Sequence, residues 1–148
     1  MKQYSMISII CSLLLLVAGM TGCSSDENDK DIADLCETSW RLYGFGTSAN
    51  MLQKAEPSEC STCYVIKFEP DGSFTGRTTS NEISGSYSIS SNSFKIVNCL
   101  MTYVGEVGDG NKYIDAFRSS VRWEITEDRH LKLYYNEQND FLLFNPQE

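Results

Sequence analysis

The chain has 148 residues, with 12 Lys and Arg against 20 Asp and Glu and a net charge of −8. This length suits one domain and leaves no room for a second full domain. The acidic balance argues against nucleic acid and anionic lipid surfaces as partners, because both would repel the protein.

The first residues have the features of a bacterial lipoprotein signal. Lys2 precedes an apolar segment over residues 6–19, which is too short to span the roughly 30 Å hydrocarbon core of a membrane. Small residues stand directly before Cys23, as lipoprotein processing requires. We therefore expect residues 1–22 to be a signal peptide and the Cys23 thiol to carry a diacylglycerol. The alternative is an ordinary secretory signal that ends near a cysteine by chance.

Residues 23–35 are acidic and polar with few apolar anchors, so we expect a flexible tether that cannot order itself by burial. Lipidation of Cys23 would hold the protein at the outer membrane, facing the periplasm or the cell surface. An acidic run after a lipidated cysteine resembles the signal by which some Gram-negative bacteria export lipoproteins to the outer leaflet. A solvated spacer without address information is the alternative.

Cysteine usage predicts a disulfide-stapled domain over residues 36–148. Cys11 leaves with the signal and Cys23 takes the lipid, so four of the six cysteines remain. An even number in an oxidising compartment predicts two disulfides, with three possible connectivities. The candidates are Cys36, Cys60, Cys63 and Cys99.

Two other uses of these cysteines are possible. Cys60 and Cys63 have the C-x-x-C spacing of thiol oxidoreductases, but that chemistry needs the first thiol at a helix N-terminus, and a strand is predicted directly after Cys63. A zinc site has enough ligands, yet a second C-x-x-C pair is missing. Structural disulfides are the favoured interpretation, and no metal or cofactor is expected.

Beyond Cys36, apolar residues alternate over short segments that are separated by turn residues. Tyr64, Ile66 and Phe68 share one strand face, and Pro and Gly in the turn that follows require the chain to reverse. The expected strands are 40–45, 64–68, 73–77, 84–89, 93–97, 121–125, 131–135 and 141–144.

One amphipathic helix is expected over residues 111–119, because Tyr113, Ile114 and Phe117 recur at helical spacing. Val121 follows one turn beyond and extends the apolar face. Hairpin-connected strands with one helix predict a mainly β fold, a small antiparallel lipocalin-like barrel or curled sheet of about eight strands.

Large aromatic side chains alternate inward along these strands and are expected to form the core. They are Trp40, Tyr64, Phe68, Phe74, Tyr87, Trp123, Tyr135 and Phe144. The alternative is a cavity for one small molecule, which an eight-stranded barrel can hold. Residues 44–62 form the longest irregular stretch and are the expected binding loop.

The order of these landmarks resembles the META domain (HslJ-like) family over about 105 residues. The matching positions are Trp40-x-Leu42, Ile66-x-Phe68-x-x-Asp71-Gly72-x-Phe74-x-Gly76, Asn81, Gly85-x-Tyr87, Thr102, Trp123-x-Ile125, Leu131-x-Leu133 and Phe144. The resemblance implies a lipocalin-like β-rich fold and an envelope lipoprotein, and the family has no established common activity.

The chain departs from the family pattern at its usual cysteine pair. Thr79 and Ser80 stand where the family often has Gly-Cys, and Gly105 occupies the approximate position of the second cysteine. The resemblance therefore implies a divergent branch, and any role of the family's cysteine pair does not carry over.

No catalytic constellation is found, so the domain is expected not to be an enzyme. His130 is the single histidine and lies in a charged turn without a nucleophile motif. Asp71 and Asp109 precede glycines in turns, which explains them without a metal. The first hypothesis is an envelope module that binds a protein or glycan. The alternative is a lipocalin-like carrier of a small apolar ligand, and a hydrolase is a third, weaker option.

Overall fold

The computed structural model describes residues 25–49 and 51–147. Two α-helices, nine strands and one short 3-10 helix, η1 (Asn136–Gln138), make up this part of the chain. The α-helices are α1 (Ser25–Glu37) and α2 (Gly110–Arg118). The strands are β1 (Ser39–Thr47), β2 (Leu52–Lys54), β3 (Val65–Phe68), β4 (Ser73–Arg77), β5 (Glu82–Ser90), β6 (Ser93–Met101), β7 (Arg122–Ile125), β8 (Leu131–Tyr135) and β9 (Asp140–Gln147).

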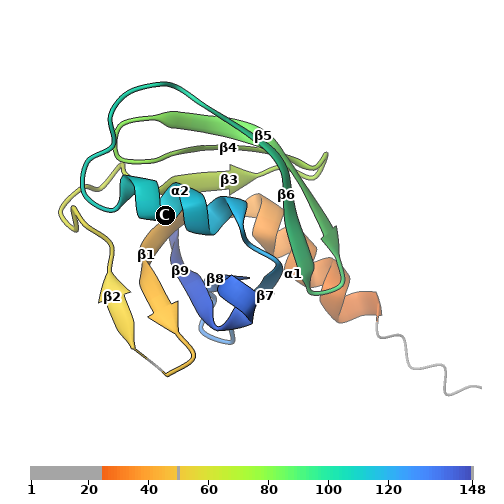
Figure 1. Cartoon of the computed structure of the whole chain (residues 1–148). Coiled ribbons are helices and arrows are strands. Elements are labelled where there is room, and N and C mark those ends of the chain that lie inside the picture. Colours follow the sequence, from red (N-terminus) through yellow and green to blue (C-terminus); the bar gives the residue numbers. More distant parts are fainter. Residues whose placement is uncertain (1–24, 50, 148) are drawn as a thin grey trace, which may run out of the picture.

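The strands form one antiparallel sheet that curls into a ring (Figure 1). The hydrogen-bonded order is β2-β1-β3-β4-β5-β6-β7-β8-β9, and β9 pairs back onto β1 from Ser39↔Gln147 to Thr47↔Asp140. The mainly β, curled-sheet fold is therefore confirmed. β2 is additional to the eight expected strands, and it lies within the stretch that was expected to be irregular.

The ring has one weak junction, between β6 and β7, which share only the pair Ser93↔Arg122. Helix α2 lies beside this junction (Figure 1). Its Arg118 donates a hydrogen bond from Nη2 to the Cys99 carbonyl of β6, at 3.2 Å. The helix thus contributes contacts at the point where the ladder of hydrogen bonds is interrupted.

Helix α2 was expected over 111–119, and it buries Tyr113, Ile114 and Phe117 as expected. Val121 is 46% exposed because the chain has already turned toward β7. The Phe117 ring lies 5.2 Å from Phe74 and 5.9 Å from Tyr113, centroid to centroid. Such edge-to-face and stacked contacts contribute beyond the area that they bury.

The aromatic core agrees closely with the sequence-based expectation. Seven of the eight aromatic residues expected inside are buried, and Tyr135 is half-buried against the core. Phe68 is at the centre, because its ring contacts those of Tyr87, Phe94 and Phe117. These rings fill the space that the curled sheet encloses.

The tether expected over 23–35 is a helix where the structure describes it, since α1 covers Ser25–Glu37. The expectation rested on mean composition and overlooked spacing: Ile32, Leu35 and Cys36 lie on one helix face and pack on the core. The Trp40 indole donates a hydrogen bond to the Leu35 carbonyl at 2.9 Å. Neither helix of the described residues is long and apolar enough to cross a membrane.

Two glycines explain local geometry. Gly72 has a φ of +84° in the turn between β3 and β4, a conformation that side chains disfavour. A Cβ on Gly46 would collide with the Phe141 ring, so this glycine lets the β9 aromatic pack closely on β1.

Candidate functional site

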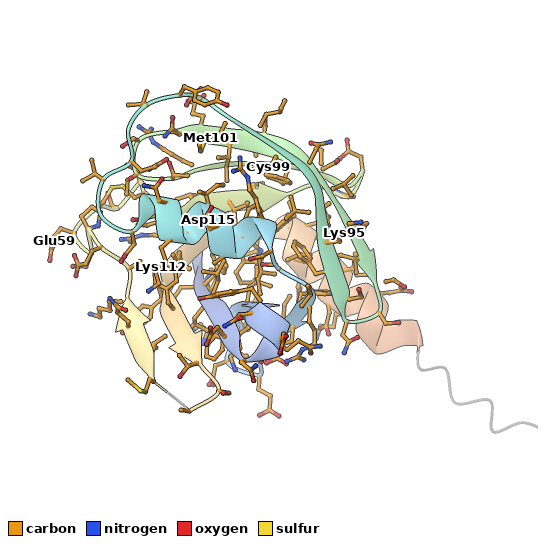
Figure 2. The ribbon with its side chains drawn as sticks, in the orientation of Figure 1. Glu59, Lys95, Cys99, Met101, Lys112 and Asp115 are labelled. Carbon is orange, nitrogen blue, oxygen red and sulfur yellow. A yellow bond between two sulfur atoms is a disulfide. The ribbon has the colours of Figure 1, made fainter. Side chains whose placement is uncertain are left out.

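The expected lipidation site, Cys23, lies outside the described residues. Among the four disulfide candidates, Cys60 and Cys63 form a bridge with an S–S distance of 1.99 Å. Cys36 and Cys99 are free thiols in the structure. Cys36 is buried at the Tyr87 hydroxyl, 3.3 Å away, whereas Cys99 faces α2 from β6 (Figure 2). The second expected bridge is therefore absent.

The stretch 44–62, the expected binding loop, is tied down along much of its length. β2 pairs with β1, and the Cys60 carbonyl accepts a hydrogen bond from Arg41 Nη2 at 2.8 Å. Glu56 and Asp109 exchange two hydrogen bonds, of 2.8 and 2.9 Å. This stretch is therefore held against β1 and linked to the segment after β6.

Asn81, a family-like landmark in the sequence, is the hub of a buried polar network. Its side-chain Nδ2 donates to the Val104 carbonyl at 2.7 Å and to Glu106 at 2.6 Å. Its Oδ1 accepts from the Thr102 hydroxyl at 2.9 Å and from the Val104 amide at 2.8 Å. Asn81 is fully buried and makes all four hydrogen bonds that its side chain allows.

Glu106 is the second centre of this network. The hydroxyls of Thr78 and Thr79 each lie 2.5 Å from one of its carboxylate oxygens, and the Ser80 amide donates at 3.3 Å. Partial burial raises the Glu106 pKa, but hydrogen bonds from Thr78, Thr79, Asn81 and Ser80 outweigh it and hold the pKa below its ordinary value. The carboxylate thus ties the β4–β5 turn to the segment after β6.

The segment held by this network presents apolar side chains to solvent. Residues 100–107, which we call the apolar loop, expose large fractions of four side chains: Leu100 70%, Tyr103 99%, Val104 60% and Val107 62%. Exposed apolar side chains on a surface are common when scattered singly. Four within eight residues, on a loop anchored by Asn81 and Glu106, form a concentrated feature.

A hollow of about 730 Å³ lies on the outer face of β3, β4, β5 and β6, and the first residues of the apolar loop, Leu100, Met101 and Thr102, line one side of it. We call it the outer groove. Lys67 and Arg77 supply its positive charges, and Glu82 supplies a negative one. A second hollow of about 410 Å³ lies between β1 and the chain around Pro57. Both hollows open to solvent.

The remaining sequence candidates are surface residues. Asp71 accepts two hydrogen bonds from Ser73, which closes the β3–β4 turn and lowers the Asp71 pKa. His130 lies in the β7–β8 turn, where its amide bonds the Thr126 hydroxyl at 3.1 Å. Within the described residues, no three His, Cys, Asp or Glu side chains gather into a metal-binding group.

Comparison with known protein families matches residues 33–148 to the META domain. The chain belongs to the META domain family. The match begins inside α1, so it includes the apolar end of this helix, Leu35 and Cys36, as well as the whole sheet. No curated protein matches the chain.

Two solved structures share the META-like fold of this chain at low sequence identity. An NMR structure of a protein from Burkholderia xenovorans has a TM-score of 0.61 and 15% identity, covering 78% of this chain and 86% of its own. The crystal structure of a DUF4847 family protein from Bacteroides vulgatus has a TM-score of 0.59 and 16% identity, covering 77% and 96%.

In this member of the META domain family, the polar network joins the two segments in which the family's usual cysteines are missing. The sequence resemblance puts the family's usual cysteines near Ser80 and Gly105. In this chain the same two segments are joined through the carboxylate of Glu106 and the amide of Asn81. Hydrogen bonds therefore connect the segments from which the cysteines are missing.

Sequence reasoning identified Asn81 and Thr102 only as landmarks and missed Glu106, the apolar loop and the outer groove. One signal was available for the loop: Tyr103, Val104 and Val107 stand among glycines without the alternation of a strand. Because no strand is predicted there to bury them, the apolar side chains of such a segment are expected to be exposed. No comparable signal marked the groove, which depends on register across four strands.

Proposed function

We propose that the protein is an envelope lipoprotein, anchored through Cys23 at the outer membrane, whose META domain binds a partner protein through the apolar loop. The domain acts without catalysis. The observation that carries the proposal is the exposure of Leu100, Tyr103, Val104 and Val107 on one anchored segment.

The composition of the apolar loop supports this function. Aromatic residues are enriched at the cores of protein interfaces, and Tyr is a frequent source of binding energy. Burying Tyr103 and its three aliphatic neighbours against a partner would remove from water the side chains that the fold leaves exposed.

The anchoring of the loop supports it as well. Asn81 fixes the Val104 backbone on both sides, through its N–H and its carbonyl. A loop that is already ordered loses little conformational freedom on binding, which favours affinity. The carrier alternative has less support, because aromatic rings occupy the interior and the largest hollow described above opens on the outer face.

Site-specific photocrosslinking in the full-length protein, in cells that produce it, tests the proposal. A photoreactive residue at position 103 should give a discrete protein adduct, because that side chain is 99% exposed at the centre of the apolar loop. The same residue at position 121, which carries an exposed valine outside the loop, is the matched control. Adding Val107→Asp should abolish the adduct at 103. An adduct of equal yield at both positions, or none at 103, would contradict the proposal.

A further inference from the structure

The outer groove follows from strand register. Lys67 lies opposite Thr75, Thr75 opposite Ser84, and Ser84 opposite Leu100, which gives one row across four strands. A second row runs from Val65 through Arg77 to Glu82. Small side chains occupy the middle of the first row, so the sheet surface is hollow there, between longer side chains.

The positive charges of the groove have no ion-pair partner. In the part of the chain that the structure describes, the ion pairs join Glu124 to Arg122 and Lys132, and neither Lys67 nor Arg77 takes part in one. Glu82 is opposite Arg77 in register but forms no ion pair with it. The groove thus holds two cations against one carboxylate on a chain whose net charge is −8.

We propose that the outer groove binds a carboxylated oligosaccharide, with Lys67 and Arg77 holding the carboxylates. Guanidinium and ammonium groups form charge-assisted hydrogen bonds to carboxylates. The hydroxyls of Thr75 and Ser84 can each donate and accept, as sugar hydroxyls require. Leu100 offers an aliphatic surface to the C–H face of a sugar ring.

The composition of the groove disfavours other occupants. Cores of protein interfaces are depleted in Lys, Glu and Ser, which this groove contains, so it differs from the apolar loop. An apolar ligand would leave Lys67 and Arg77 desolvated without partners. The volume of about 730 Å³ lies within the usual range for small-ligand sites. The groove shares Leu100, Met101 and Thr102 with the apolar loop, but the inference does not depend on the proposed protein partner, since both cations lie outside that loop.

Calorimetric titration of the full-length protein in detergent tests the inference. The probes are the trisaccharides of galacturonic, glucuronic and mannuronic acid, each compared with its neutral methyl ester, and a triglutamate peptide. At least one free acid should bind, with its ester about tenfold weaker or more, because the ester loses the charge-assisted bonds. Triglutamate should bind more weakly than that acid, because it lacks the sugar hydroxyls.

Variants place the binding in the groove. Lys67→Gln and Arg77→Gln should each weaken the bound trisaccharide about tenfold, since each removes one charge-assisted contact. Lys95→Gln is the matched control, because Lys95 is exposed on β6 far from the groove end at Met101 (Figure 2). Val104→Asp should leave the affinity for the trisaccharide unchanged, which separates this site from the apolar loop. Binding of none of the three acids, binding of triglutamate as tight as that of the best acid, or wild-type affinity for the trisaccharide in both groove variants would overturn the inference.

Discussion

At the scale of single residues, Asn81 and Glu106 have a structural role that the sequence alone did not reveal. Both are polar residues whose side chains receive or make several short hydrogen bonds at once, and together they hold the part of the apolar loop that follows β6 and has no regular structure. A buried network of this kind is stabilising only while every member is satisfied. The apolar loop therefore depends on a few polar atoms beneath it.

The depressed pKa of Glu106 gives a pH dependence with a defined sign. The folded pKa lies below the ordinary value of 4.5, so folding favours the carboxylate, and that stabilisation is complete above pH 4.5 and is lost as pH falls through the folded pKa. We expect wild type to exceed Glu106→Gln in melting temperature at pH 7. The difference should shrink steadily below about pH 4.5.

Thermal unfolding followed by circular dichroism from pH 3 to pH 7 measures this difference. Glu59→Gln is the control, since Glu59 is exposed and its substitution removes a charge without touching the network (Figure 2). A gap between wild type and Glu106→Gln that stays constant over the whole range would show that the carboxylate contributes nothing specific.

At the scale of elements, the alternation of apolar residues and the positions of turn residues predicted most of the strands of the sheet. The strands expected at 73–77 and 131–135 have the observed bounds, because each is a short alternating segment between strong turn signals. β2 was missed because its three residues are all exposed and show no buried face. The prediction of a second disulfide was wrong because a count of cysteines does not say how far apart two thiols lie in the fold. Cys36 lies on α1 beside Tyr87, whereas Cys99 lies on β6.

Helix α1 differs most from the sequence-based expectation, and this difference can be measured. Leu35 is fully buried in the last turn of α1, so Leu35→Ala should lower the free energy of unfolding by about 3 kcal/mol, as other buried Leu→Ala changes do. Ala33→Ser, at an exposed position of the same helix, should change it by less than about 0.5 kcal/mol. Urea unfolding of both variants gives the two values. If both variants changed the free energy of unfolding equally and only slightly, the result would support a flexible tether instead of a packed helix.

At the scale of the whole molecule, the proposed lipid anchor at Cys23 would determine where the domain acts. Cys23→Ser removes the thiol that would be acylated, so we expect the variant to move from the membrane fraction to the soluble fraction, because the acyl chains supply the membrane affinity. Cys11→Ser is the matched control, since it lies within the expected signal peptide and should leave the protein in the membrane fraction. Fractionation with intact mass measurement tests both variants. Membrane retention of Cys23→Ser would refute lipidation as the anchor.

The closure of the ring has a consequence for how the domain folds. β1 pairs with β9, and the first residue of β1, Ser39, meets Gln147 at a sequence separation of 108 residues. β9 follows the other eight strands along the chain, so one edge of β1 has no strand to pair with until the intervening residues have been synthesised. Contacts between such distant segments slow folding, and an open strand edge invites association with other chains in the meantime. The same pairing that removes two sheet edges in the native state therefore leaves β1 open to association with other chains until β9 is available.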